Sequence, residues 1–249
     1  MKTIPEIFRT SAALTLAGLL PALYATAADT PLRTLVVTGG HAYDTNEFRA
    51  VFTAMQDVTP IFVEHPEAAD WLKADRAGEW DVLVLYDMWQ PVTAGTRLDF
   101  QNRLREGKGL VAMHHSLANH QDWPRYAEII GGRYHLEPWQ KDGHTEPAST
   151  YQHDLELEVQ VLNPWHPVTA GLKDFTIHDE GYGKLELKPT AKPLLAVRHP
   201  ESSPVVAWTK TWEGARVAGI QLGHDRAAYA NPAFQQLTHN AIRWVARRN

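Results

Sequence analysis

The stretch Gly109-Leu110-Val111-Ala112-Met113-His114-His115-Ser116 decides the fold. Its apolar, β-prone first half runs directly into two adjacent histidines, and a helix-like segment follows shortly after. In an open α/β sheet, ligands bind at the carboxyl ends of the strands, because the chain turns there and exposes its side chains to a crevice. Adjacent side chains of an extended chain point to opposite faces, so without local distortion we expect at most one of His114 and His115 to face such a site.

Strand and helix patterns alternate ahead of this stretch. Short apolar runs rich in β-branched residues predict buried parallel strands at residues 32–38, 59–64, 81–86 and 110–113. Amphipathic helical patterns separate them, at residues 46–56, 66–75 and 94–105. This alternation predicts a doubly wound, mostly parallel α/β sheet.

The pattern changes after His115. A short helix at residues 123–130 is expected to end at Gly131-Gly132, and an irregular loop is expected over residues 133–151, a length that is usually functional. Further strands are expected at residues 155–161, 193–197, 205–209 and 216–222, residues 175–187 fit no single pattern, and a last helix begins at Pro232. We therefore predict one domain, residues 28–249, with extra C-terminal strands.

The first 27 residues have the three parts of a secretory signal peptide. Lys2 and Arg9 are basic, residues 11–23 are largely apolar, and Ala25-Thr26-Ala27 is a small-residue cleavage pattern before Ala28. A buried N-terminal helix is the alternative. No later segment reaches the ~20 apolar residues of a membrane span. We expect a periplasmic or secreted protein.

Composition narrows the chemistry. Removing Lys2, Glu6 and Arg9 takes away a net charge of +1, so the mature chain would carry −6 rather than −5. Such an acidic chain lacks the basic surface that binding to nucleic acid requires. The chain has no cysteine, which excludes disulfides and a thiol nucleophile, and it holds 9 Trp and 13 His. A chain rich in tryptophan and histidine indicates a function that acts on small polar molecules.

Histidines follow several of the predicted strands. His41 follows the first strand, His114 and His115 the fourth, and His224 the last. If the sheet is parallel, these ends lie along one edge, and imidazoles with a carboxylate suit Zn²⁺ or a similar divalent ion. For each histidine taken alone, a hydrogen-bonded core or surface role is the alternative. We assign that structural role to His65, His120, His153, His199 and His239.

Glu180 is the best carboxylate candidate for a general base or a metal ligand. Its neighbour Asp179 should point elsewhere if the segment is extended. Tryptophan rings can stack on the apolar C–H faces of sugars, and the candidates are Trp89, Trp123, Trp139 and Trp165. Trp123 stands at the start of a predicted helix, which favours a packing role for it. No glycine-rich phosphate loop opens a helix, so no nucleotide cofactor is expected.

Several further motifs carry a family resemblance, in this order: Gly39-Gly40-His41, the His114-His115 turn, Trp123-Pro124-Arg125-Tyr126, Gly131-Gly132-Arg133-Tyr134-His135, His166-Pro167-Val168-Thr169-Ala170-Gly171-Leu172, Asp179-Glu180-Gly181-Tyr182, Ala207-Trp208-Thr209 and Gly223-His224. Together they resemble the ThuA-like (trehalose utilisation) family over nearly the whole mature chain. That resemblance implies a class I glutamine amidotransferase-like, flavodoxin-type fold. It also implies a link to the catabolism of trehalose and related disaccharides.

The resemblance also marks a departure. Amidotransferases hold a cysteine nucleophile on the turn after the equivalent strand, whereas Met113-His114-His115 stands there in this chain. Hydrolysis of glutamine by a thiolate is therefore excluded, and the resemblance implies that the position has been re-used.

From these motifs we expect an exported enzyme of sugar breakdown. Its reaction, as a hydrolase, lyase or isomerase, would act on a monosaccharide, a disaccharide or a keto-sugar. It would depend on histidines, which either bind a divalent metal or act as acid and base groups. The expected residues are His114 and Glu180 for catalysis, His41, His114 and His224 for the metal, and Trp123, Tyr126, His135 and Tyr182 for the substrate. The alternatives are a non-catalytic sugar-binding protein and an interaction module that has lost the site. The sequence leaves the substrate and the oligomeric state open.

Overall fold

The computed structural model describes residues 1, 30–88 and 90–248. The predicted signal segment, apart from Met1, and Trp89 therefore lie outside the described residues. Among the helices of the described part, none combines the length and apolar character that crossing a membrane requires.

A nine-stranded sheet forms the centre of the protein, in the order β2-β1-β3-β4-β13-β12-β11-β8-β9. Five neighbouring strands are parallel: β2 Val58–Glu64, β1 Leu32–Thr38, β3 Val82–Leu85, β4 Gly109–Met113 and β13 Ala215–Ile220. The other four pair antiparallel: β12 Val205–Trp212, β11 Lys192–Val197, β8 Thr150–Val161 and β9 Phe175–Gly183. The mostly parallel α/β sheet with extra C-terminal strands is thus confirmed.

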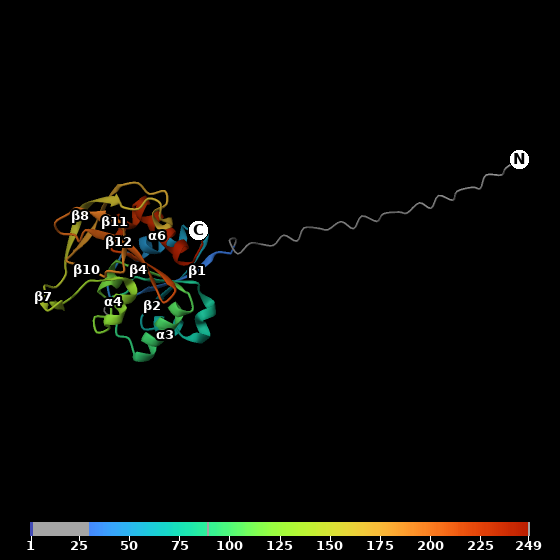
Figure 1. The fold of residues 1–249 in the computed structure, drawn as a ribbon, viewed down its shortest axis with the longest axis horizontal. Coiled ribbons are helices and arrows are strands. Elements are labelled where there is room, and N and C mark those ends of the chain that lie inside the picture. Colours follow the sequence, from blue (N-terminus) through green and yellow to red (C-terminus); the bar gives the residue numbers. More distant parts are fainter. Residues whose placement is uncertain (2–29, 89, 249) are drawn as a thin grey trace.

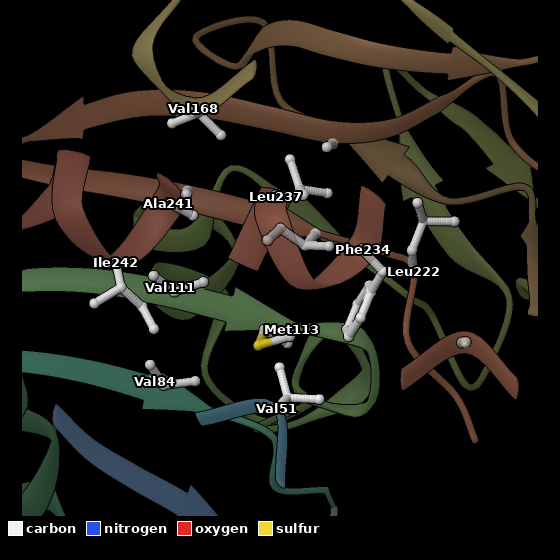
Figure 2. Close-up of a cluster of buried hydrophobic side chains, with 14 of the residues drawn as sticks. Val51, Val84, Val111, Met113, Val168, Leu222, Phe234, Leu237, Ala241 and Ile242 are labelled. Carbon is white, nitrogen blue, oxygen red and sulfur yellow. The ribbon is translucent and has the colours of Figure 1, made fainter. Parts of the chain in front are cut away.

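Helices cover both faces of the sheet (Figure 1). One face packs against α1 Thr45–Thr53 and α6 Pro232–Val245, and Figure 2 shows Phe234, Leu237 and Ile242 of α6 over the parallel strands. The other face packs against α2 Ala68–Trp71, α3 Ala94–Arg105 and α4 Pro124–Ile130. This double cover explains why the parallel strands read as continuous apolar runs.

Local sequence sets where the helices begin. The Thr93 hydroxyl accepts from the amide of Thr96 at the start of α3, and the Asn231 side chain accepts from the amides of Ala233 and Phe234 at the start of α6. A short helix, α5 Arg226–Ala230, begins in the same way at Asp225. These caps set where α5 and α6 begin, after the loop that follows β13.

The structure differs from the sequence expectations in three segments. The loop expected over residues 133–151 contains a small hairpin, β6 Trp139–Lys141 with β7 His144–Glu146. The ambiguous segment 175–187 is β9 followed by β10 Glu186–Leu187, which pairs with β5 Gly132–Arg133. The helix expected over 66–75 is only one turn long, and the 3₁₀ segment η1 Ala74–Glu79 follows it. Such short strands give too little periodicity to read from sequence.

Trp208 locks the antiparallel half of the sheet to α4. Its ring is fully buried, its Nε1–H donates to the carbonyl of Ile130 at 2.8 Å, and Gly219 is its register partner on β13. A Cβ at Gly219 would lie only 2.2 Å from Trp208 Cε2. Glycine at this position therefore makes room for the indole.

We expect Gly219→Ala to lower the free energy of unfolding by ~1–3 kcal/mol, because the added methyl overpacks the indole. The control is Gly78→Ala, where a Cβ would meet nothing within 4 Å. Urea unfolding followed by fluorescence measures both. Equal stability losses in the two variants would contradict this account of the packing.

Asp57 ties the start of β2 to α6. Its carboxylate accepts from His239 Nε2 at 2.6 Å and pairs with Arg243. Burial alone would raise the pKa of Asp57, but these two partners outweigh it and lower the pKa below its usual value. The stability that this carboxylate contributes is therefore complete above the unfolded-state pKa of ~3.9 and is lost as the pH falls below it.

We expect Asp57→Asn to reduce stability by ~1 kcal/mol near neutral pH, the range of a partly exposed ion pair. The difference from the wild type should shrink as the pH is lowered through the carboxylate range. Thermal unfolding across a pH series measures it, and a difference that stays constant in acid would show that the Asp57 charge plays no part.

Candidate functional site

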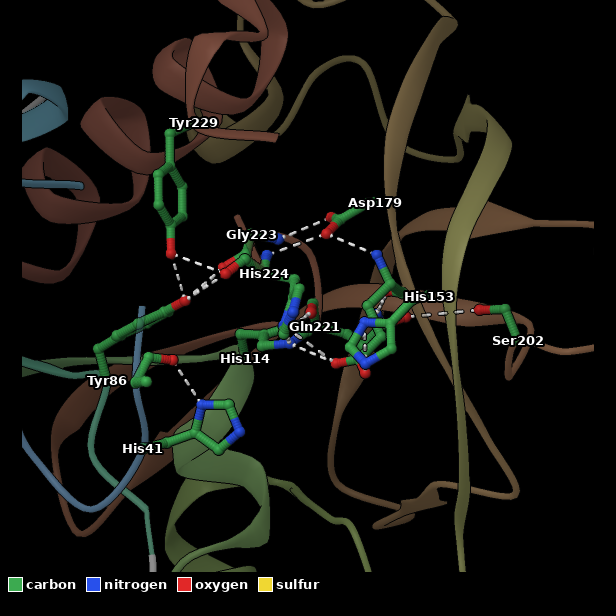
Figure 3. Close-up of polar contacts among 12 residues, drawn as sticks. His41, Tyr86, His114, His153, Asp179, Ser202, Gln221, Gly223, His224 and Tyr229 are labelled. Atoms are coloured by element: carbon green, nitrogen blue, oxygen red, sulfur yellow. Dashed lines mark hydrogen bonds and ion pairs between the residues drawn. The ribbon is translucent and has the colours of Figure 1, made fainter. Parts of the chain in front are cut away.

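Four strands bring the candidate residues to one edge of the sheet. Figure 3 shows His41, His114 and His224 of this set. His41 follows β1, His114 and His115 follow β4, His224 follows β13, and Glu180 lies in the second half of β9. The hollow between them, called here the histidine pocket, encloses about 220 Å³. Its lining consists of His41, Met88, His115, Ala118, Tyr134, Leu136, Tyr151, His153, Glu180, Tyr182 and His224.

A sharp turn brings both adjacent histidines to this site. His114 begins the 3₁₀ segment η2 His114–Ala118 with a φ of 39°, in the left-handed region. A non-glycine residue held there costs of order 1–3 kcal/mol, and such strain clusters at functional sites. The ring centroids of His114 and His115 lie 5.2 and 5.6 Å from that of His224. The rule of opposite faces applies to an extended chain, and this chain leaves that conformation at His114.

Glu180 is the centre of the cluster. Its Oε2 lies 2.9 Å from His114 Nε2 and 3.3 Å from His224 Nδ1, and the two nitrogens are 3.2 Å apart. His114 Nδ1 lies 2.5 Å from the carbonyl oxygen of Gln221, which can only accept, so Nδ1 carries the proton. Three atoms with lone pairs therefore meet at one point, and a shared cation, either a proton or a metal ion, must stabilise them.

The electrostatics of Glu180 favour the charged form. Burial would raise the pKa of Glu180, but its contacts with the imidazoles of His114 and His224 outweigh burial and lower the pKa to about 2. The pKa of His224 is raised, because Glu180 outweighs the effect of burial on that imidazole. Near neutral pH, Glu180 is therefore a fixed anion, which suits a role as a cation ligand.

Asp179 fixes the loop that carries His224. Its carboxylate accepts from the backbone amides of Gly223 at 2.7 Å, His224 at 2.9 Å and Glu180 at 2.8 Å. Burial raises the pKa of Asp179, and the charge of His114 and the three amides oppose that rise. As expected for neighbours on a strand, Asp179 points to the backbone while Glu180 faces the imidazoles.

His115 is buried with unmet hydrogen-bonding capacity. Only 2 % of its surface is exposed, and neither ring nitrogen has a hydrogen-bond partner among the described residues. Burial and the neighbouring histidines push the pKa of His115 far below its usual range, so the ring is neutral. A buried group of this kind calls for a partner. The unprotonated nitrogen of a neutral imidazole is a metal-ligating atom.

Two more histidines lie at the mouth of the pocket. His41 is exposed, lies 2.6 Å from the carbonyl of Ala42 through Nδ1, and has its ring centroid 4.2 Å from that of His115. His153 is half exposed, and its Nδ1 lies 3.3 Å from Glu180 Oε1. A register irregularity between Gln152 and Leu155 re-aims His153 toward the pocket, as bulges beside active sites do.

A second layer of polar contacts holds the far end of η2. Asp87, just after β3, accepts from Asn119 Nδ2 at 2.5 Å and contacts His65 Nε2 at 2.9 Å. The Asn119 side-chain oxygen in turn accepts from the amides of Gln90 and His120. These contacts hold the segment that carries His114 and His115. Because His65 and His120 take part in them, both histidines have a structural role.

The predicted substrate residues separate into two groups. Tyr182 lines the pocket and stacks on His114, with ring centroids 4.5 Å apart. Trp123 and Tyr126 instead belong to the buried core, and the Tyr126 hydroxyl donates to the carbonyl of Ser116. His135 also lies outside the pocket, where its Nε2 contacts Glu186 at 2.8 Å. The structure therefore places only Tyr182 of these four beside the histidines.

The donor set fits a small divalent cation. Ligands ~2.0–2.1 Å from one tetrahedral ion lie ~3.3 Å apart, close to the separations within the group of His114 Nε2, His224 Nδ1 and Glu180 Oε2. Ligand atoms of His114, His115 and His224 also lie within 4.8 Å of one another, as do those of His153, Glu180 and His224. The bond from His114 Nδ1 to a backbone carbonyl is the outer-shell contact typical of a metal-bound imidazole.

His153 is the main residue that sequence reasoning missed. In the sequence it stands among Gln152 and Asp154 in a polar stretch that reads as loop. Only the pairing of β8 with β9 and the local irregularity direct it at Glu180. Tyr134 and Tyr151, on either side of the hairpin, likewise line the pocket without any sequence signal.

The parallel strand order β2-β1-β3-β4-β13, in a sheet covered on both faces, is that of a flavodoxin-like α/β protein. The chain matches the family model described as ThuA, trehalose utilisation, over residues 33–245. The protein belongs to this family, which confirms the resemblance in its motifs. No protein of curated function matches the chain.

Solved structures share this fold. A ThuA-like protein from Parabacteroides merdae ATCC 43184 superposes with a TM-score of 0.74 at 19% identity, over 87% of this chain and 90% of that one. A ThuA-like protein from Bacteroides uniformis ATCC 8492 gives 0.62 at 20% identity, over 91% and 95%. A cytoplasmic protein from Salmonella typhimurium LT2 gives 0.55 at 12% identity, over 87% and 98%. At these identities the likeness concerns the fold.

We expect Asp179→Asn to lower the free energy of unfolding by ~1–3 kcal/mol, because an amide cannot accept from all three backbone N–H groups. Hydrogen exchange at the amides of Gly223 and His224 should become faster. Asp174→Asn is the matched control, since the Asp174 carboxylate accepts from the amide of Val161 at an exposed position. Similar losses in both variants would show that Asp179 does not organise this loop.

Proposed function

We propose that this ThuA family protein is an exported, metal-dependent enzyme of carbohydrate breakdown. The observation that carries the proposal is the group of three ligand atoms on His114, Glu180 and His224, at separations of 2.9–3.3 Å. His115 offers a further candidate ligand atom, because its neutral ring is buried beside the group without a hydrogen-bond partner among the described residues. A borderline divalent ion such as Zn²⁺ suits three imidazoles and one carboxylate.

The proposed set revises the ligands expected from sequence. His115 takes the place assigned to His41, since His41 is exposed and lies at the rim, with its ring centroid 6.3 Å from that of His224. Glu180 serves as a ligand anion, because its Oε2 lies 2.9 Å from His114 Nε2 and 3.3 Å from His224 Nδ1. His114 keeps its place at the centre of the site.

The size of the pocket supports a small substrate. A volume of about 220 Å³ corresponds to ~7 water molecules at ~30 Å³ each and is below the ~300 Å³ at which drug-sized pockets begin. One sugar ring fits this space better than a whole disaccharide. The rings of Tyr134, Tyr151 and Tyr182 supply apolar walls with polar tips, the mixed surface that a sugar presents in return.

The chemistry proposed follows from these parts. A bound ion would polarise a carbonyl or hydroxyl oxygen of the sugar. His153 lies at the mouth of the pocket beside Glu180, where it would exchange a hydrogen bond with a sugar hydroxyl. The hydrogen bond from Asn119 to Asp87 holds the segment that carries the ligand histidines. The chain has no cysteine, so the thiolate chemistry of amidotransferases is not available to it.

Export is proposed from the basic, apolar and small-residue parts of the first 27 residues. Removal of this segment would leave a chain beginning at Ala28. A periplasmic or extracellular location would place the enzyme where small sugars enter a cell.

One experiment tests location and metal together. We expect the full chain, expressed in a Gram-negative host, to be recovered from the periplasm with an intact mass that begins at Ala28. Elemental analysis should find one divalent ion per chain, and chelation should lower the melting temperature reversibly.

His114→Ala should abolish ion binding. His239→Ala should leave ion binding unchanged, because His239 lies on α6 and is paired with Asp57.

Turnover is tested on a panel of sugars and 3-keto-sugars. We expect product formation with the metal-loaded wild type and its loss in His114→Ala. Sugar binding without product after long incubation would contradict the enzyme assignment and leave a binding protein. A chain that holds no ion after zinc loading would contradict the metal site.

A further inference from the structure

A second hollow lies outside the histidine pocket and is called here the outer groove. It measures about 710 Å³ and lies between the start of α4, the β5–β10 pair and the β6–β7 hairpin. Its main features are Arg125, Glu128, His135, Trp139, Glu186 and Lys188. None of its described lining residues also lines the histidine pocket.

A single segment separates the two hollows. Along residues 133–136, Arg133 and His135 line the outer groove, whereas Tyr134 and Leu136 line the histidine pocket. This alternation is what an extended chain produces, with successive side chains on opposite sides. The wall between the two hollows is therefore one strand thick.

Trp139 forms a rigid platform in the outer groove. Its ring lies parallel to that of His135, with an interplanar angle of 2° and centroids 4.1 Å apart. His135 is itself fixed, because its Nε2 lies 2.8 Å from Glu186 Oε2 and its amide donates to the Ser149 hydroxyl. One face of the indole is thus backed by an imidazole that contacts hold in place.

A chain of ion pairs fixes this platform further. Lys188 Nζ lies 2.6 Å from Glu186 and 3.0 Å from Glu128, which joins β10 to α4. Burial would raise the pKa of Glu186, but His135 and Lys188 outweigh it and lower the pKa below its usual value. The platform is therefore assembled before any ligand arrives, which reduces the entropic cost of binding.

The charges around the groove are nearly balanced. The cations are Arg125, Arg133, Lys141 and Lys188, and the anions are Glu128, Asp142 and Glu186. A net excess of one positive charge gives little attraction for a phosphate or another polyanion. Paired donors and acceptors around an aromatic plane instead suit a neutral polyhydroxylated ring, whose C–H face is apolar and whose hydroxyls both donate and accept.

We infer that the outer groove is a second carbohydrate-binding subsite, in which Trp139 stacks against one ring of a neutral oligosaccharide. The inference rests on the proposed function for the class of ligand and extends it, because the histidine pocket has room for about one ring.

The test uses the full mature chain and a panel of neutral saccharides: trehalose, maltotriose, cellotriose and xylotriose. We expect at least one of them to shift the Trp139 indole N–H signal in a nitrogen–proton spectrum. Trp139→Ala should weaken that saccharide's affinity by about threefold to tenfold, equivalent to ~0.7–1.4 kcal/mol. Trp165→Ala is the matched control, because Trp165 is 92% exposed and does not line this groove.

Two further measurements keep the outcome decisive. His114→Ala should bind the same saccharide at the Trp139 signal, so loss of the metal site and loss of the groove are separable. Equal melting temperatures of wild type and Trp139→Ala exclude a folding defect. The inference is overturned if no saccharide of the panel shifts the Trp139 signal, if only inorganic phosphate does so, or if Trp165→Ala weakens binding as much as Trp139→Ala.

Discussion

A buried anion surrounded by imidazoles is the constraint on which the site depends. Glu180 is nearly inaccessible, and its carboxylate stays charged only because His114 and His224 contact it at 2.9 and 3.3 Å. Asp179, one residue earlier, holds the loop of His224 through the amides of Gly223 and His224. Two adjacent carboxylates on β9 therefore perform two tasks, one holding the backbone and one gathering the imidazoles.

This constraint explains why the antiparallel strands matter. The parallel strands bring His41, His114, His115 and His224 to one edge, but none of them supplies a carboxylate to the cluster. Glu180 enters from β9, at the end of the added antiparallel half of the sheet. The extra strands thus complete the site.

The sequence was sufficient to predict the parallel strands and most of the helices that cover them. Strand β1 and helix α3 have the predicted bounds, because continuous β-branched runs and a capped, glycine-stopped helix are strong local signals. The convergence of His114 with His224 also followed from strand polarity. What could not be predicted depends on tertiary geometry: the left-handed turn at His114 brings His115 into the cluster, and the irregularity in β8 aims His153 at Glu180.

The substrate residues show a second limit of sequence reasoning. Aromatic and histidine residues near a functional loop look alike in sequence, yet Trp123 packs in the core while Tyr182 stacks on His114. His135 lies on the opposite side of the wall from Tyr134. Which side of an extended segment faces a pocket depends on its register, and a register without a regular strand leaves no periodic signal.

The direct test of the central claim is X-ray absorption at the zinc edge on the zinc-loaded protein. We expect one ion with nitrogen and oxygen ligands at ~2.0–2.1 Å, outer-shell scattering from at least two imidazoles, and loss of that scattering in Glu180→Gln. An ion surrounded by water ligands alone, or a spectrum unchanged by Glu180→Gln, would contradict the claim.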